Sequence, residues 1–266
     1  MTDSLAAIDA ERAEIRRHLE RQYAGVFGPA EIEFHLNAHV GDAFADYACQ
    51  VMAVATPLGS RILDVGAGYG SFVMLARARG FRAIGTEIAA FEVAYARRRL
   101  ARERPGDDGD AVFLDQGIFH AALDGAQFEA ITFWNVLEHI DDFGPVIARA
   151  AALLASGGAI YVVCPNYAAW RNEAHYQIPW RPFVTRHAAS RRIRKHGKDP
   201  HFFETSVFQR TNWGLMAELK RHGLILYDRL NQTRMHAGRA VTSPSLFLDY
   251  YNPARAAVEL AARKPA

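Results

Sequence analysis

Short apolar segments alternate with amphipathic stretches from residue 61 onward, and this alternation predicts an α/β fold. The apolar segments predict strands at 61–65, 82–86, 111–114, 129–134, 158–164 and 224–230. Between them, apolar positions recur with the period of a helix, which predicts helices at 71–80, 90–104, 143–155 and 211–222. Strands that are apolar on both faces and joined by helices are typical of a doubly wound, mostly parallel sheet with right-handed crossovers.

The first 57 residues have a helical pattern of their own. One apolar stripe predicts a first helix through Leu5, Ile8, Ile15, Leu19 and Tyr23. The pattern breaks at Gly25, Gly28 and Pro29, and a second stripe runs from Phe44 to Val54. These helices either cover a ligand site or pack on the core.

This pattern divides the chain into four parts. We expect an N-terminal helical cap at 1–57, an α/β core at 58–165, an insert at 166–205, and the remaining core with a C-terminal tail at 206–266. The tail segment YYNPARAAVELAARK, at 250–264, ends in a predicted helix. No internal repeat is visible.

Composition excludes several classes of protein. Half of the residues are hydrophobic and 23% are charged, so the chain can bury a sizeable core and is not disordered. No apolar stretch reaches the roughly 18 residues of a membrane span, and the N-terminal segment does not have the pattern of a signal peptide. Cys49 and Cys164 are too few for a disulfide framework, which favours a cytoplasmic location.

The most specific motif is a glycine-rich turn between a strand and a helix, Ile62-Leu63-Asp64-Val65-Gly66-Ala67-Gly68-Tyr69-Gly70. Glycines let the backbone approach a ligand closely, and a helix N-terminus offers free N–H groups. Glu87 follows at the end of the next predicted strand, where a carboxylate can accept hydrogen bonds from both hydroxyls of a ribose. The pattern therefore indicates a cofactor that contains adenosine.

Two details separate this motif from a dinucleotide site. The fingerprint G-x-G-x-x-G is broken, because its third glycine comes one residue early and Ser71 occupies the expected place. Asp64 places a carboxylate on the strand before the first glycine, where a pyrophosphate would be repelled. A buried carboxylate there suits a cationic group such as an α-amino group.

These residues resemble the S-adenosylmethionine (SAM) site of class I SAM-dependent methyltransferases. FLDQG at 113–117 is similar to the end of the family's third strand, and FWNVLEHIDD at 133–142 resembles its ubiquinone-biosynthesis-like, small-molecule branch. The Ser156-Gly157-Gly158 turn and the strand AIYVVCPN match the family's fifth strand. The resemblance covers 58–165, and extends loosely over 201–230 as a strand, a helix and a strand.

The resemblance implies a seven-stranded, Rossmann-like methyltransferase fold with SAM as the cofactor and the insert as a substrate lid. It implies that Asp115 and Gln116 contact the adenine, and that Asn135 and Leu137 line the methionine part through their backbone. The expected cofactor-binding residues are Asp64, Gly66, Ala67, Gly68, Gly70, Glu87, Ile88, Asp115, Gln116, Asn135 and Leu137.

Candidate catalytic residues are His139, His175 and Tyr176. His139 follows a central strand on the side where ligands of such sheets bind, and it could take a proton from an attacking hydroxyl. Alternatively, His139 only orders its loop. His175 and Tyr176, from the insert, either act on the substrate or pack within the insert.

Other chemistry lacks its motif. The chain has no Asn/Asp-Pro-Pro-Tyr/Phe segment after the fourth strand, which argues against methylation of adenine or cytosine amines in DNA. Cys164-Pro165 has the reverse order of the Pro-Cys nucleophile of cytosine C5 chemistry. No His or Cys cluster has zinc spacing, and the acidic pair Asp141-Asp142 lacks the downstream Asp-Asn that a magnesium site would need, so we expect no metal.

Charge bears on the acceptor. Residues 171–201 carry +6, which leaves −4 on the rest of a chain whose net charge is +2. Trp170 precedes this basic segment, which itself contains Tyr176, Trp180 and Phe183. The combination fits an acidic small molecule, an RNA, or a solvated surface.

The leading hypothesis is a SAM-dependent O-methyltransferase. Its acceptor would be a small molecule, such as a sugar, a phenol or a natural-product intermediate, with an acidic or phosphorylated one included. The alternatives are N-methylation or RNA methylation, an NAD-type oxidoreductase, and a SAM-binding module without turnover. Nucleic acid is disfavoured as a partner, no membrane partner is expected, and a homo-oligomer is left open.

Overall fold

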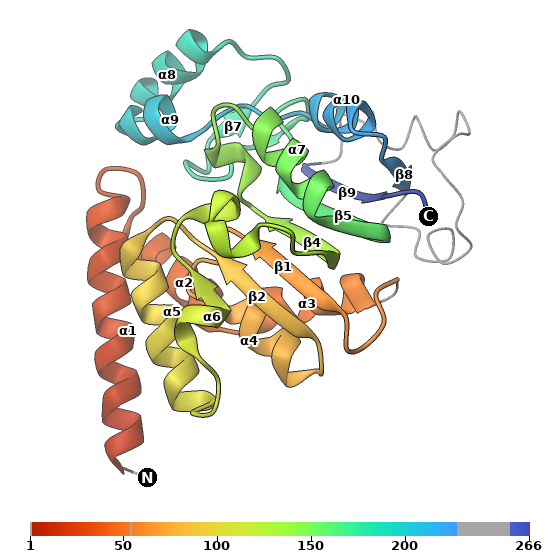
Figure 1. The fold of residues 1–266 in the computed structure, drawn as a ribbon. Coiled ribbons are helices and arrows are strands. Elements are labelled where there is room, and N and C mark those ends of the chain that lie inside the picture. Colours follow the sequence, from red (N-terminus) through yellow and green to blue (C-terminus); the bar gives the residue numbers. More distant parts are fainter. Residues whose placement is uncertain (1, 54, 228–255) are drawn as a thin grey trace.

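The computed structural model describes residues 2–53, 55–227 and 256–266 (Figure 1). Its centre is a seven-stranded sheet in the order β3-β2-β1-β4-β5-β9-β8. The strands are β1 (Arg61–Val65), β2 (Arg82–Thr86), β3 (Phe113–Leu114), β4 (Phe128–Trp134), β5 (Leu154–Pro165), β8 (Ile225–Tyr227) and β9 (Ala257–Arg263). Strands β1 to β5 are parallel, and β9 runs antiparallel to both of its neighbours. The predicted doubly wound, mostly parallel sheet is confirmed.

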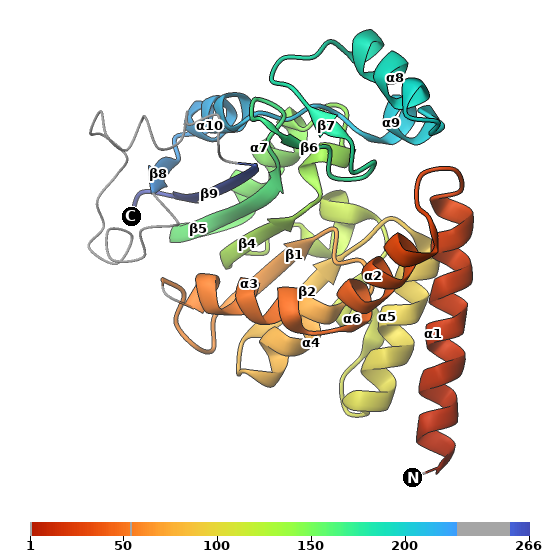
Figure 2. The ribbon, with the colours of Figure 1, turned by 180° about the vertical axis from the view of Figure 1, so that it is seen from behind.

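Helices cover both faces of the sheet (Figures 1 and 2). The helices are α1 (Thr2–Gln22), α2 (Pro29–Val40), α3 (Ala43–Ala53), α4 (Ser71–Ala78), α5 (Ala90–Glu103), α6 (Gly109–Val112), α7 (Gly144–Leu153), α8 (Arg186–Lys195), α9 (His201–Ser206) and α10 (Asn212–Arg221). Residues from α3, α4 and α5 form the core on one face, and residues from α7 and α10 form it on the other. Single-turn helices are η1 (Gly117–Phe119), η2 (Ala121–Leu123) and η3 (Leu137–His139), and a small separate sheet pairs β6 (Arg171–Asn172) with β7 (Pro179–Trp180).

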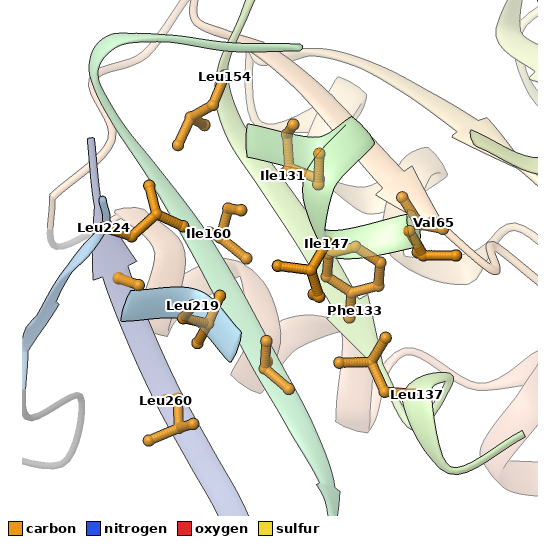
Figure 3. Packing of buried hydrophobic residues seen from close by; sticks show 14 of the residues in the cluster. Val65, Ile131, Phe133, Leu137, Ile147, Leu154, Ile160, Leu219, Leu224 and Leu260 are labelled. Atoms are coloured by element: carbon orange, nitrogen blue, oxygen red, sulfur yellow. The ribbon is translucent and has the colours of Figure 1, made fainter. Parts of the chain in front are cut away.

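Alternate residues of each central strand enter opposite cores, as the side-chain period of two requires. Ile131 and Phe133 of β4 pack with Ile160 of β5 and Ile147 of α7 (Figure 3). Ala130 of β4, by contrast, belongs to the cluster on the other face. Apolar side chains therefore fill both faces of these strands. Polar side chains are placed mainly at the strand ends, where the loops of the site begin.

The C-terminal tail contradicts its predicted helix. Ala257–Arg263 forms β9, which pairs with β5 over seven registered positions and with β8 on its other side. Alanine, leucine and glutamate favour a helix locally, but the strand satisfies backbone groups of two neighbours and buries Val258 and Leu260. Tertiary pairing therefore overrides local propensity.

Two further predictions need correction. The strand expected at 111–114 is shortened to Phe113–Leu114, because its first half forms α6. The strand implied after His201 is the helix α9. Residues 228–230 of the last predicted strand lie outside the described residues.

The N-terminal cap packs against the glycine-rich turn and α5. Pro29, which we interpreted as a break, begins α2, since proline is well tolerated in the first turn of a helix. Ile15, Leu19 and Leu36 share a buried cluster with Tyr69 of the glycine-rich turn. The end of α1 therefore lies near the carboxyl ends of the strands (Figures 1 and 2).

Within the described ranges, none of the helices has the length and apolar character needed to cross a lipid bilayer. Cys49 and Cys164 are both buried and unpaired.

Candidate active site

The glycine-rich turn connects β1 to α4 at the carboxyl end of the sheet. Gly66, Gly68 and Gly70 have φ angles of 75°, 52° and 81°, in the left-handed region that favours glycine. A Cβ on Gly66 would lie 2.4 Å from Val136 Cγ2, so the turn packs closely against the loop after β4. Glycine at position 66, beside Ala67, is therefore required both by the backbone conformation and by this close packing.

Asp64 lies at the end of β1 and is buried. Thr132 of β4, its register partner, donates a hydrogen bond from Oγ1 to Asp64 Oδ1 at 2.6 Å. Burial raises the pKa of Asp64 to about 7, against the smaller opposing effect of the Thr132 hydrogen bond. A cationic group beside this carboxyl would restore its charged form.

Glu87 links two loops at the end of β2. One carboxylate oxygen accepts the N–H of Gly68 at 3.0 Å, and the other accepts the N–H groups of Ile88 and Ala89 at 2.7 and 2.9 Å. These bonds fix the direction of the carboxylate beside the glycine-rich turn. Next to it, the Ile88 side chain is 79% exposed, which is unusual for a large apolar residue.

The other predicted cofactor residues lie on neighbouring strand ends. Asp115 and Gln116 follow β3 and are exposed, and Asp115 is 3.8 Å from His120 Nε2. Asn135 follows β4 with a φ of 56°, and its N–H donates to Val163 O at 2.7 Å. Leu137 has a fully buried side chain, and its carbonyl accepts a hydrogen bond from Arg210 Nε at 2.9 Å.

His139 and His175 come together from different parts of the chain. Their ring centroids are 5.2 Å apart, and Phe202 of α9 contacts both rings. His139 Nδ1 is 2.6 Å from Ser206 O, and because a carbonyl only accepts, Nδ1 carries the proton and Nε2 is free to accept one. Burial and the nearby His175 lower the pKa of His139 to about 4.

Glu173 holds His175 in place, and the sequence analysis missed it. This fully buried carboxylate accepts from His175 Nδ1 at 3.1 Å and from Tyr167 Oη at 2.6 Å. It also accepts the backbone N–H groups of His175 and Tyr176 at 2.7 and 2.6 Å. Burial alone would raise the pKa of Glu173, but these donors lower it to about 2. An ionised Glu173 therefore orients His175 with Nε2 as its basic nitrogen.

Tyr176 does not join the two histidines. Its hydroxyl donates to Asp199 O at 2.8 Å and accepts from the N–H of Phe203 at 3.1 Å. The ring lies in the apolar cluster of the insert together with Trp180. The structure thus gives Tyr176 the packing role, which was one of its two expected roles.

The N-terminal cap contributes aromatic side chains to which the sequence analysis gave no role in the site. Tyr23 lies 5.1 Å from Phe202 between ring centroids and 6.2 Å from His35 of α2. The cap, the insert and the loop after β4 consequently meet at Phe202. The only signal in the sequence was the Tyr23 position on the first helical stripe, which is equally typical of packing.

Several basic side chains of the segment 171–201 form hydrogen bonds or ion pairs with other groups of the protein. Arg186 donates to the carbonyls of Phe203 and Val207, and Arg192 donates to Pro179 O. Arg194 pairs with Glu204 at 2.9 Å. These contacts do not support an acidic acceptor. Among the described residues, no three His, Cys, Asp or Glu side chains form a group that could hold a metal ion.

Comparison with known proteins identifies the class. Residues 38–216, more than half of the chain, match the family model described as a methyltransferase domain. The chain is 32% identical over 118 residues to the ubiquinone biosynthesis O-methyltransferase of Xanthomonas axonopodis pv. citri, which covers 44% of this chain and 47% of that protein. It is 27% identical over 120 residues to the same enzyme of Thiobacillus denitrificans, covering 45% and 49%. The matched part spans about half the length of these curated relatives.

Solved structures share the fold at low sequence identity. Magnesium protoporphyrin IX methyltransferase from Synechocystis PCC 6803, with bound S-adenosylhomocysteine (SAH), has a TM-score of 0.56 at 15% identity and covers 98% of this chain and 97% of that one. Haemonchus contortus phosphoethanolamine N-methyltransferase 2, in complex with SAM, has a TM-score of 0.55 at 15% identity and covers 95% and 60%.

The chain therefore belongs to the methyltransferase-domain family, and it is a class I SAM-dependent methyltransferase. The predictions of the family, the enzyme class and SAM as the cofactor are confirmed.

Proposed function

We propose that this protein methylates a hydroxyl of a small-molecule acceptor, and that His175 takes the proton of that hydroxyl. The observation that carries the proposal is the hydrogen bond of 3.1 Å between His175 Nδ1 and the ionised Glu173. An alcohol or a phenol must lose its proton, so it needs a base such as a neutral histidine held by a carboxylate, whereas an amine or a thiol needs a base less. The O-methyltransferase relatives are consistent with this chemistry.

The cofactor residues predicted from the sequence fit SAM. Asp64 would bind the α-amino group, Glu87 the ribose, and the exposed Ile88 would pack on the adenine next to Asp115 and Gln116. The backbone of Asn135 and Leu137 would line the methionine part. SAM supplies the methyl group when bound.

For the acceptor oxygen to take the methyl group of bound SAM, which would leave as SAH, the hydroxyl must give up its proton. His175 Nε2 accepts the hydroxyl proton, and the Glu173 carboxylate stabilises the resulting imidazolium. His139, with its pKa lowered to about 4, stays neutral and offers Nε2 as a hydrogen-bond acceptor that positions the acceptor hydroxyl.

The insert at 166–205 would act as a substrate lid together with the cap. It carries His175 and Phe202, and Tyr23 of the cap contacts Phe202. Excluding water from the reacting atoms is the main contribution of such a cover. The free, buried cysteines are consistent with a cytoplasmic location.

The test is SAH release from SAM with panels of phenols, catechols, sugars, amines and RNA. We expect turnover with a hydroxyl acceptor, and a loss of about 100-fold or more in kcat for His175→Asn. His139→Ala should raise KM more than it lowers kcat. His196→Ala, an exposed histidine at the end of α8, is the matched control. Turnover with amines or RNA alone, or an unchanged kcat of His175→Asn, would contradict the proposal.

A further inference from the structure

The segment 206–210 begins at the last residue of α9 and leads toward α10 (Figure 1). Two of its residues bond to the loop after β4. Ser206 O lies 2.6 Å from His139 Nδ1, and the N–H of Phe208 donates to Glu138 O at 2.7 Å. The backbone of the segment therefore follows the turn that carries His139.

The residues in between bond to the insert. Val207 O accepts from Arg186 Nη1 at 2.8 Å, and Gln209 Nε2 donates to Val184 O at 2.7 Å. The segment 206–210 consequently lies between the insert and the loop that carries His139, and it is hydrogen-bonded to both.

Arg210 makes the largest number of bonds to that loop. Its guanidinium donates to the carbonyls of Leu137 and Asp141 at 2.9 and 2.8 Å, and also to the carbonyl of Ile140. Its Cζ lies 4.5 Å from the centre of the Phe143 ring, as in a cation–π contact. A guanidinium presents several N–H donors in a rigid fork, and the single ammonium of a lysine does not.

The turn η3, at Leu137–His139, is weakly held by its own hydrogen bonds. It is a single turn of 3₁₀ helix, a conformation whose hydrogen bonds have poorer geometry than those of an α-helix. The N–H of Ile140 donates to Leu137 O at 3.4 Å, whereas Arg210 Nε donates to the same carbonyl at 2.9 Å. Donors from outside the turn therefore fix its position.

We propose that Arg210 is a positioning residue, which holds the loop after β4 on the segment 206–210 and thereby keeps His139 bonded to Ser206 O. In this arrangement Nδ1 of His139 carries the proton and Nε2 is an acceptor, because the bond of one ring nitrogen sets the state of the other. The use of Nε2 to position an acceptor hydroxyl rests on the proposed function, whereas the tautomer itself does not.

NMR spectra of the imidazole nitrogens in isotope-labelled protein, recorded at neutral pH without an acceptor, measure this tautomer. The spectrum of His139→Gln assigns the signals. We expect the Nδ1–H form in the wild type, and in Arg210→Ala a ratio of the Nδ1–H to the Nε2–H form that is lower by about 3- to 10-fold, the range of one hydrogen bond. Arg210→Lys keeps the charge but not the fork, so it should show the same fall, and it tests the point if Arg210→Ala does not fold.

Arg82→Ala is the matched control. Arg82 also donates to a carbonyl, that of Gly59 at 2.7 Å, but it lies at the start of β2, at the opposite end of the sheet. This variant should leave the tautomer of His139 unchanged.

Two results would overturn the proposal. One is an unchanged tautomer in the Arg210 variants, even where SAH binds more weakly in calorimetry, since Arg210 would then hold the cofactor side of the loop only. The other is a wild-type tautomer in Arg210→Lys, because charge alone would then suffice. A shifted tautomer in a protein that methylates no hydroxyl would support the positioning role and refute the proposed O-methylation, so the two failures are distinguishable.

Discussion

Replacing Glu173 by glutamine is the perturbation whose effect follows most directly from the structure. The buried carboxylate accepts four hydrogen bonds, from the Tyr167 hydroxyl, from His175 Nδ1, and from the N–H groups of His175 and Tyr176. A glutamine of the same shape is neutral and can accept through one atom only. We expect Glu173→Gln to lose stability and catalytic activity together.

The pKa of Glu173 sets the size of the loss. Burial opposes ionisation, but the donors lower the pKa to about 2, compared with 4.5 for an ordinary glutamate. A difference of about 2.5 between the two pKa values corresponds to about 3 kcal/mol of stability from the ionised form. Because the folded pKa lies below the unfolded one, this contribution is complete above about pH 5 and is lost as the pH falls from about 4.5 toward 2.

Urea unfolding of the wild type and Glu173→Gln, followed over pH, measures this contribution. The free energy of unfolding should be about 3 kcal/mol lower for the variant at pH 7, and the gap should narrow below about pH 4.5. Tyr167→Phe, which removes one donor but keeps the charge, should lose only about 1–2 kcal/mol. Equal stability of the wild type and Glu173→Gln at pH 7 would refute the assignment of an ionised, hydrogen-bonded Glu173.

Three further outcomes follow from single residues. The affinity for SAH should rise between pH 6 and 8, because a bound ammonium group lowers the pKa of Asp64 from about 7 and releases its proton. Asp64→Asn should lose this rise. A wild-type affinity that does not change with pH in calorimetry would contradict the pairing of Asp64 with the ammonium group. Gly66→Ala should abolish measurable SAH binding, since its Cβ would lie 2.4 Å from Val136 Cγ2 at a φ of 75°, and retained affinity would show that the loop can adjust. Leu260→Ala, in the fully buried centre of β9, should lower the free energy of unfolding by about 2–5 kcal/mol in urea, whereas a negligible change would argue against β9 as a central strand.

Local patterns predicted the parts of this protein that depend on neighbouring residues in the chain. The alternation of apolar runs and helical stripes predicted the order of β1 to β5 and α4, α5, α7 and α10. The glycine-rich turn could be located because a turn that needs positive φ angles requires glycine. Asp64 and Glu87 are predicted beside it because strand ends of a parallel sheet meet at one edge.

Tertiary structure alone decided the rest. The residues of β9 favour a helix by propensity, and only pairing with β5 and β8, far away in sequence, makes them a strand. The approach of His175 to His139 and the contact of Tyr23 with Phe202 join segments that no short-range pattern connects. The raised pKa of Asp64 likewise comes from desolvation by surrounding chain. Sequence by itself determined the glycine-rich turn, because positive φ angles are a local requirement that glycine meets. The burial of Glu173 and the meeting of His175 with His139 were decided by tertiary packing, since burial and non-local contacts exist only once the chain has folded.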